Sequence, residues 1–143
     1  MLRAVELGLT YFDTAAGYGN GEGEAIFSEA LSQIENRVFL ATKLPPSTQG
    51  AGRSVANNLE RLRMDDLDLI QIHGSSYSDE VTPSILSEGG LLAELEALRD
   101  EGLVRFNGFT TEDNNAGVYK FIRSGRSDSV QMTYNLLRQH PAE

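Results

Sequence analysis

The feature that most constrains the fold is a regular alternation of two hydrophobic patterns along the chain. Short, β-prone apolar runs are separated by longer segments in which apolar residues recur every three or four positions. The expected strands span 9–13, 37–43, 66–73, 103–110 and 128–134. The expected helices between them span 23–35, 52–64, 89–102 and 114–125. Strands that alternate with helices in this way form parallel sheets with helical crossovers, so the sequence predicts an α/β fold.

Glycines mark several of the expected helix boundaries. Residues 1–8 have the pattern of a short helix that ends at Gly8, and Gly102 and Gly125 stand where two later helices are expected to end. In the segment 23–35 the apolar spacing predicts one face that covers a core. That face comprises Ile26, Phe27, Ala30, Leu31 and Ile34.

Two architectures fit this alternation, a doubly wound sheet and a (β/α)₈ barrel. A dinucleotide-binding doubly wound sheet carries G-x-G-x-x-G directly after its first strand. The run GYGNGEG that follows Asp13 has a different spacing, and Glu22 and Glu24 would repel a phosphate at the start of the next helix. The barrel is therefore favoured. A complete barrel takes about 250 residues, so we expect a partial TIM (β/α)₈ barrel of about five parallel strands, forming one incomplete domain over residues 1–143.

Composition excludes several classes of partner. The net charge of −9 argues against nucleic acid and against an anionic membrane surface as the main partner. No apolar stretch approaches the roughly 18 to 20 residues of a membrane span, and the first residues lack the apolar core of a signal peptide, so we expect a cytoplasmic protein. There are no cysteines, and we assign no metal site.

Titratable residues close three successive expected strands. Asp13 ends the first, Lys43 the second and His73 the third, and Tyr18 lies in the small-residue loop that follows Asp13. Catalytic residues of barrels lie at the carboxyl ends of the strands. Each residue has an ordinary explanation on its own. Asp13 can be a turn former, Lys43 a solvated lysine, His73 a hydrogen-bonded histidine and Tyr18 a packing aromatic. As a set, they indicate a catalytic site.

The four side chains have complementary chemistry. A phenol is a weak acid at neutral pH, and a neighbouring ammonium such as Lys43 stabilises the phenolate. Asp13 would hold that ammonium in place, and a neutral His73 would orient a substrate oxygen. The sum is a proton donor aimed at a carbonyl oxygen. The carbon must then accept hydride, which no side chain supplies, so a nicotinamide or flavin cofactor is required. We expect the Lys43 nitrogen to lie near both the Tyr18 oxygen and an Asp13 oxygen.

Five separated blocks resemble the aldo/keto reductase family, in order and over nearly the whole chain. They read FDTAAGYGNGEGE, RVFLATKLPP, LERLRMDDLDLIQIH, LLAELEALRDEGLVRFNGFT and VQMTYNLL. The resemblance implies an NADP(H)-dependent oxidoreductase that reduces an aldehyde or ketone to an alcohol on a (β/α)₈ barrel. It implies Tyr18 as the proton donor, with Asp13, Lys43 and His73 completing the tetrad.

The resemblance also implies a partial cofactor site. Gln131 matches a glutamine that contacts the nicotinamide amide, and Thr110 matches a Ser/Thr after the family's fifth strand. Thr111 departs from the asparagine that many members have, which puts that contact in doubt. A strand before Met1 and two strands after Glu143, with most of the phosphate-binding residues, are expected to be missing.

The resemblance implies a small carbonyl compound or alcohol as the substrate, and the sequence does not name it. Barrel specificity is set by loops, here 74–90, in which Tyr77, Val81 and Ile85 either line an apolar pocket or pack the loop.

Other interpretations remain open on the sequence alone. The chain is alternatively an accessory or regulatory barrel, a truncated product without activity, or an aldolase in which Lys43 forms a Schiff base. Five strands cannot close an eight-stranded circle, so open edges are expected to favour self-association. The last strand would then expose Val130, Met132 and Leu136.

Overall fold

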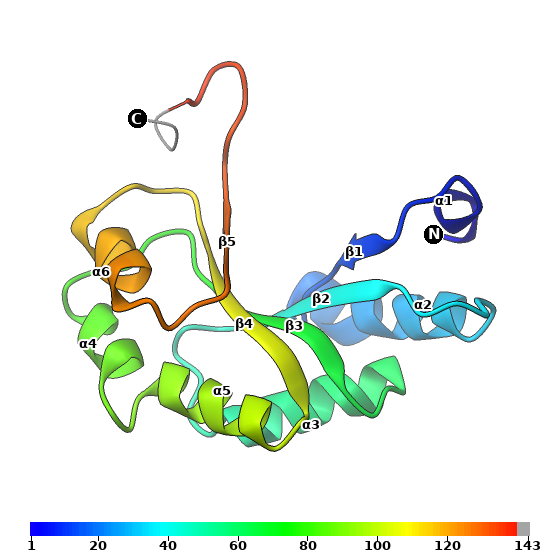
Figure 1. Ribbon diagram of the computed structural model, residues 1–143, viewed down its shortest axis with the longest axis horizontal. Coiled ribbons are helices and arrows are strands. Elements are labelled where there is room, and N and C mark those ends of the chain that lie inside the picture. Colours follow the sequence, from blue (N-terminus) through cyan, green and yellow to red (C-terminus); the bar gives the residue numbers. More distant parts are fainter. Residues whose placement is uncertain (140–143) are drawn as a thin grey trace.

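A computed structural model describes residues 1–139 as a single curled sheet with helices packed against it (Figure 1). The sheet has five strands, all pairs are parallel, and their order in the sheet is their order along the chain. The strands are β1 (Tyr11–Asp13), β2 (Phe39–Leu44), β3 (Leu67–His73), β4 (Val104–Thr111) and β5 (Ser129–Met132). The sheet is a half-barrel, which confirms the predicted partial TIM barrel.

The helices include two short elements that the sequence pattern did not predict. These are the 3-10 helix η1 (Tyr18–Gly21) and α4 (Val81–Leu86), which is too short to show a helical period. The predicted helices are α1 (Leu2–Glu6), α2 (Glu22–Leu31), α3 (Ala51–Leu62), α5 (Leu91–Asp100) and α6 (Ala116–Ser124).

The prediction of the apolar face of α2 is partly wrong. Ile26 is 65% exposed, and Ile34 lies beyond the end of the helix. Phe27 and Leu31 do pack against the core, but the buried positions of the helix are Glu24 and Ser28. A carboxylate therefore occupies a place on the inner face where the pattern predicted only apolar side chains.

The hydrophobic core lies between the sheet and the helices on its convex side. Helices α3 and α5 run beneath the sheet in Figure 1, with α2 at one flank and α4 and α6 at the other. The strands and these helices contribute side chains that are almost completely buried, each stabilising the fold by about 1.5 to 3 kcal/mol relative to exposure. They include Leu40, Ile70, Ile72, Phe109, Val55, Leu62, Leu92, Leu95 and Phe121.

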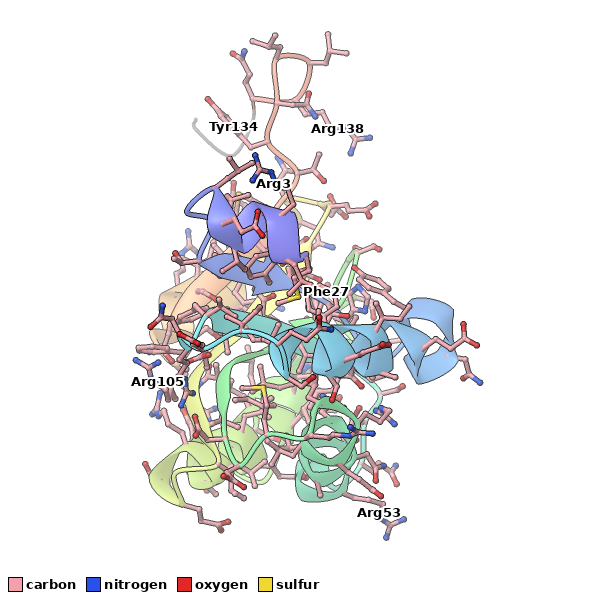
Figure 2. All side chains as sticks on the ribbon, turned by 90° about the vertical axis from the view of Figure 1, so that its right-hand side faces the viewer. Arg3, Phe27, Arg53, Arg105, Tyr134 and Arg138 are labelled. Carbon is pink, nitrogen blue, oxygen red and sulfur yellow. The ribbon has the colours of Figure 1, made fainter. Side chains whose placement is uncertain are left out.

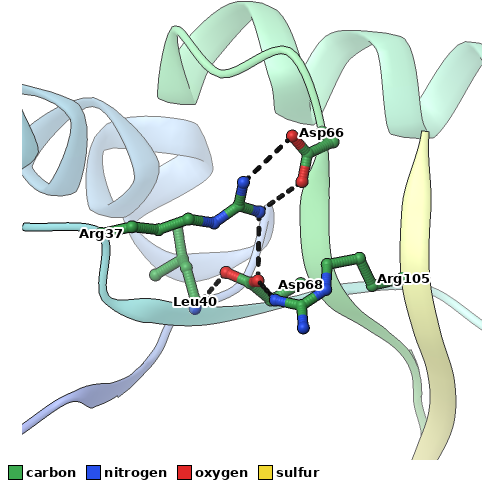
Figure 3. Close-up of polar contacts among 5 residues, drawn as sticks. All are labelled: Arg37, Leu40, Asp66, Asp68 and Arg105. Atoms are coloured by element: carbon green, nitrogen blue, oxygen red, sulfur yellow. Dashed lines mark hydrogen bonds and ion pairs between the residues drawn. The ribbon is translucent and has the colours of Figure 1, made fainter. Parts of the chain in front are cut away.

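A buried carboxylate fastens three strands together near their amino ends (Figure 3). Asp68 of β3 is 0% exposed and accepts a hydrogen bond from the Leu40 backbone N–H at 3.0 Å. Arg37 Nη2 donates to the same carboxylate at 3.1 Å, and Arg105 of β4 forms an ion pair with it. Arg37 also binds Asp66, and this hydrogen bond lowers the pKa of the Asp66 carboxyl. Charge pairing thus holds β2, β3 and β4 at the end of the sheet opposite the predicted site.

The concave face of the sheet is open in the part of the chain that the structure describes. No helix spans it between β1 and β5 (Figure 1). Aromatic rings stack across it, with centroid distances of 5.3 Å between Tyr11 and Phe39 and 6.2 Å between Phe39 and Phe106. Tyr11 is 51% exposed and Phe106 is 38% exposed. This row of rings is apolar surface without a cover.

The segment that follows β5 extends away from the sheet (Figure 1). In the side view of Figure 2, the labelled Tyr134 and Arg138 lie above the sheet, beyond the labelled Arg3 of α1. Val130 is 39% exposed and Leu136 is 91% exposed, as expected for an open edge, while Met132 is half-buried. Within residues 1–139, no helix is long and apolar enough to cross a membrane.

Candidate active site

The strand register brings the predicted residues onto one face in a regular stagger. Asp13 pairs with Ala41, two residues before Lys43 in β2. Lys43 pairs with Gln71, two residues before His73 in β3. Residues two apart in a strand point to the same face, so Asp13, Lys43 and His73 all lie on the concave side. This stagger is the strand shift that a barrel requires, and it places the three residues at one mouth.

The Lys43 ammonium is buried and held by oxygen atoms. Its side chain is 2% exposed and forms an ion pair with Asp13, whose side chain is 25% exposed. Nζ also donates a hydrogen bond to the Thr14 carbonyl oxygen at 2.7 Å. A buried ammonium is stable only when it is paired in this way. Lys43 is therefore a fixed positive charge at the carboxyl end of β2.

Tyr18 lies against both Lys43 and His73. It begins η1, directly after the loop of small residues, and is 46% exposed. Lys43 Nζ lies 5.3 Å from the centroid of the Tyr18 ring. The His73 ring meets the Tyr18 ring edge to face, with centroids 5.8 Å apart. The expected contact of Lys43 with Asp13 is present. Among the described residues, Lys43 Nζ makes no hydrogen bond to the Tyr18 hydroxyl, and its contact with Tyr18 is with the phenol ring.

The environment of His73 favours its neutral form. Burial lowers the pKa of its imidazole, and the positive charge of Lys43 lowers it further, while Asp13 opposes the shift. A neutral imidazole keeps one N–H group and can donate a hydrogen bond to an oxygen atom.

A cavity of about 210 Å³ opens beside these side chains. It brings together Tyr18, Lys43 and His73 with the three residues that the resemblance assigned to the cofactor. His73 pairs with Thr110, and Thr110 pairs with Gln131, so one row crosses β3, β4 and β5 toward the cavity.

The two threonine hydroxyls are already engaged with the backbone. Thr110 Oγ1 accepts from the Gly74 N–H at 3.1 Å and lies 3.0 Å from the Gly74 carbonyl oxygen, to which it donates. Thr111 Oγ1 donates to the Asp113 carbonyl oxygen at 2.9 Å and accepts from the Asp113 N–H at 3.0 Å. Both hydroxyl protons are thus used within the loops, and the Gln131 amide is the side chain of this group that faces the cavity without such a bond.

The cavity has further lining residues that the sequence analysis missed. All of them follow directly after the ends of strands β3 and β4 or lie at the end of β5, which was the available signal. They are Gly74, Ser75, Glu112, Met132 and Thr133.

Loop 74–90 is anchored by a buried tyrosine. Tyr77 is 1% exposed, packs against Phe121, and its hydroxyl lies 3.0 Å from the Ile72 carbonyl oxygen and 2.9 Å from that of Thr110. Burial raises the pKa of its phenol. Ile85 is also fully buried, so both residues pack the loop and do not line an apolar pocket. Val81 lines a separate cavity of about 450 Å³ beside loop 46–50.

The fold is a parallel half-barrel, and its mouth carries an acidic, a basic, a phenolic and an imidazole side chain. These features define a (β/α) barrel protein with a polar site at the strand ends. The chain belongs to the aldo/keto reductase family, whose model matches residues 1–143. This confirms the resemblance. The family catalyses NAD(P)-dependent reduction of carbonyl compounds.

Individual relatives agree with the family assignment. The uncharacterized oxidoreductase YqkF of Bacillus subtilis is 28% identical over 153 residues, which cover 98% of this chain and 47% of YqkF. Methylglyoxal reductase YeaE of Escherichia coli is 36% identical over 117 residues, which cover 78% of this chain and 38% of YeaE. The aldo-keto reductase of Klebsiella pneumoniae, solved in complex with NADPH, superposes with a TM-score of 0.73 at 25% identity over 92% of this chain and 45% of that structure. The chain thus spans less than half the length of these relatives.

Proposed function

We propose that the chain carries the catalytic half of a carbonyl reductase that converts an aldehyde or ketone to an alcohol, with Tyr18 as the proton donor and NADPH as the reductant. The observation that carries the proposal is the convergence of Tyr18, Lys43 and His73 on one cavity, with Lys43 ion-paired to Asp13. In this mechanism the substrate carbonyl oxygen lies between the Tyr18 hydroxyl and the His73 imidazole.

Each side chain then has one task. The Lys43 ammonium, fixed by Asp13, stabilises negative charge as Tyr18 gives up its proton. The neutral His73 donates a hydrogen bond that orients the carbonyl oxygen. A nicotinamide cofactor, when bound, supplies the hydride.

The residues that line the cavity support binding of the nicotinamide end of such a cofactor. A carboxamide both donates and accepts hydrogen bonds, and the Gln131 amide offers the complementary groups in the cavity that also holds Tyr18. Thr110 and Thr111 are positioned to shape this end of the cavity, with their hydroxyl protons given to the backbone. The NADPH complex of the Klebsiella relative supports the choice of cofactor. YeaE, a methylglyoxal reductase, supports a small carbonyl substrate.

The Schiff-base alternative is disfavoured by the surroundings of Lys43. A Schiff base needs an accessible neutral amine. Lys43 is 2% exposed, ion-paired with Asp13 and hydrogen-bonded to Thr14. Borohydride with a carbonyl compound should therefore leave no covalent adduct on Lys43, and mass spectrometry would detect one.

Turnover of a Tyr18→Phe variant tests the proposed mechanism. The chain is joined to the complementary half of the Klebsiella relative, and NADPH consumption with methylglyoxal is followed by absorbance. Tyr18→Phe removes the proton donor at nearly constant shape and should lower turnover by about 10²-fold or more. Tyr134→Phe, on the segment after β5, is the matched control and should retain full turnover. Equal turnover of Tyr18→Phe and the unsubstituted chimaera would remove Tyr18 from the mechanism.

The alternative proposal is an accessory barrel without chemistry of its own. It predicts that NADPH binds to the chimaera, as seen by its fluorescence, and that no carbonyl compound is reduced. Retention of all four tetrad side chains at one mouth favours the reductase.

A further inference from the structure

A fully buried carboxylate lies directly behind the candidate active site. Glu24, near the start of α2, is 0% exposed. Its Oε1 accepts a hydrogen bond from the Thr42 hydroxyl at 2.7 Å, and its Oε2 accepts one from Arg61 Nε at 2.6 Å. None of these side chains lines the cavity beside Tyr18. A buried charge that the proposed chemistry does not use calls for a physical explanation.

The Glu24 carboxylate is fixed from the side of α3. Arg61 bridges it to the carbonyl oxygen of the Asn58 side chain, to which Nη2 donates at 3.1 Å. Gly21 leaves room for this arginine, because a Cβ atom there would lie 3.2 Å from Arg61 Cδ. Charge-assisted bonds of this kind are short and hold the carboxylate in one orientation.

The Thr42 bond connects the carboxylate to the strand that carries Lys43. Thr42 immediately precedes Lys43 in β2, and successive strand residues point to opposite faces. The Thr42 hydroxyl therefore reaches Glu24 on the helix side while the Lys43 ammonium points to the cavity. The bond fixes the position of β2 relative to α2 at the residue next to Lys43.

The start of α2 is in turn packed against Tyr18. Gly23 precedes Glu24, and a Cβ atom at Gly23 would lie 3.1 Å from Tyr18 Cβ and 3.2 Å from the Tyr18 carbonyl oxygen. Thr14 Oγ1 would lie 3.3 Å away. Only glycine allows this close approach without displacement. A shift of α2 therefore shifts Tyr18.

We propose that Glu24 is a positioning residue that holds Tyr18 against Lys43 by tying α2 to β2 through Thr42. Its importance for catalysis rests on the proposed function, whereas its geometric effect is measurable without any turnover. The chain of contacts runs from Lys43 through Thr42, Glu24 and Gly23 to Tyr18.

The reporter for the test is the His73 imidazole, which meets the Tyr18 ring edge to face at 5.8 Å. Movement of the Tyr18 ring changes the ring-current shift of the His73 ring protons, which ¹H–¹³C NMR detects. The second histidine, His140, is replaced by Gln so that a single imidazole remains. Tyr18→Leu gives the signal positions without a phenol ring.

Thr42→Val removes the hydroxyl at constant size. We expect it to move the His73 signals toward those of Tyr18→Leu, and Thr42→Ser to restore them. The matched control is Thr82→Val in α4, which removes another buried threonine hydroxyl, one that donates to the Ser78 carbonyl oxygen at 2.7 Å. This control should lower the urea midpoint without moving the His73 signals.

Two outcomes separate the positioning role from the proposed function. If Thr42→Val lowers the urea midpoint as Thr82→Val does and leaves the His73 signals in place, Glu24 is merely structural and the inference is overturned. If the signals move while Tyr18→Phe keeps full turnover in the chimaera, the positioning stands and the proposed function fails. Should Thr42→Val not fold, Thr42→Ala removes the same hydroxyl with less bulk. It must then shift the same signals in the same direction, and unchanged signals would overturn the inference.

Discussion

Replacing the members of the Asp13–Lys43 pair one at a time should have unequal effects on stability. The side chain of Lys43 is 2% exposed and that of Asp13 is 25% exposed. Asp13→Asn leaves an ammonium buried without its counter-charge, whereas Lys43→Met leaves a carboxylate on a side chain that is partly exposed. Removing one partner of a buried pair costs about 3 to 5 kcal/mol, because the remaining charge is uncompensated.

The two exposed fractions set the expected size of each effect. Asn at position 13 retains one oxygen acceptor, so Asp13→Asn should lower the free energy of unfolding by about 3 kcal/mol, the lower end of that range. Lys43→Met frees the Thr14 carbonyl oxygen and loses the pair, which should cost about 1.5 kcal/mol. The double variant buries no charge and should also cost about 1.5 kcal/mol. The sum of the single effects then exceeds the double by about 3 kcal/mol.

The assay is urea unfolding at pH 7, followed by far-ultraviolet circular dichroism at one fixed protein concentration. Fixed concentration matters because any association of the chain makes apparent stability depend on concentration. The control is Glu6→Gln, which breaks the Arg3–Glu6 pair, whose side chains are 77% and 62% exposed. Exposed pairs contribute about 0 to 1 kcal/mol. Additive single effects, or an Asp13→Asn effect no larger than that of Lys43→Met, would refute a buried ammonium held by Asp13.

Three further predictions follow from the same geometry. The depressed pKa of His73 means that the unfolded chain, with an imidazole pKa of about 6.5, binds its proton at higher pH than the folded chain. The contribution of His73 to stability is therefore fully present above pH 6.5 and is lost as the pH falls toward the pKa of the folded chain. An NMR titration should also show that Lys43→Met raises the His73 pKa in the folded chain. An unchanged pKa would exclude the lysine as a cause of the shift. Gly74→Ala would place a Cβ atom 2.6 Å from the Tyr77 ring and should lower the free energy of unfolding in urea by about 2 kcal/mol. The control Gly17→Ala, where no atom lies within 4 Å of the new Cβ, should change it by less than about 0.5 kcal/mol. Equal effects would show that loop 74–90 moves to accommodate the methyl group. Sedimentation of the 143-residue chain should show association through the open edges and the stacked aromatic rows, with weak NADPH binding by fluorescence and no measurable turnover; a monomer that binds NADPH at micromolar concentration and consumes it with an aldehyde would contradict this.

The strands, and the positions of Asp13, Lys43 and His73 at their carboxyl ends, were predictable because their signals are local. Each expected strand lies within a short apolar run, and Asp13 and His73 are the last residues of β1 and β3. Once the strands are parallel, their carboxyl ends meet at one mouth whatever the exact register. The same rule predicted the position of Lys43, although β2 continues for one residue beyond it.

The features that were missed depend on partners distant in sequence. Glu24 resembles an ordinary acidic residue in the first turn of a helix, and only its contacts with Thr42 and Arg61 show that it is buried. Tyr77 was left open between lining a pocket and packing, because an aromatic residue in a loop is compatible with both. Its hydroxyl lies within hydrogen-bonding distance of two strand carbonyl oxygens, which shows that Tyr77 packs the loop. Ile26 fitted the helical spacing, yet the sheet meets a different side of α2.

The sequential strand order has a consequence for the way the protein is made on the ribosome. Each strand pairs with the strand synthesised just before it, so the sheet can grow from its amino-terminal edge without waiting for distant segments. Such nearest-neighbour pairing keeps contact order low for a parallel sheet and avoids the large loop-closure cost that slows folding. Asp13, Tyr18, Lys43 and His73 all lie within the first three strands and their connections. The nascent chain can therefore bring these four side chains together once β3 has docked, while β4 and β5 are still being translated.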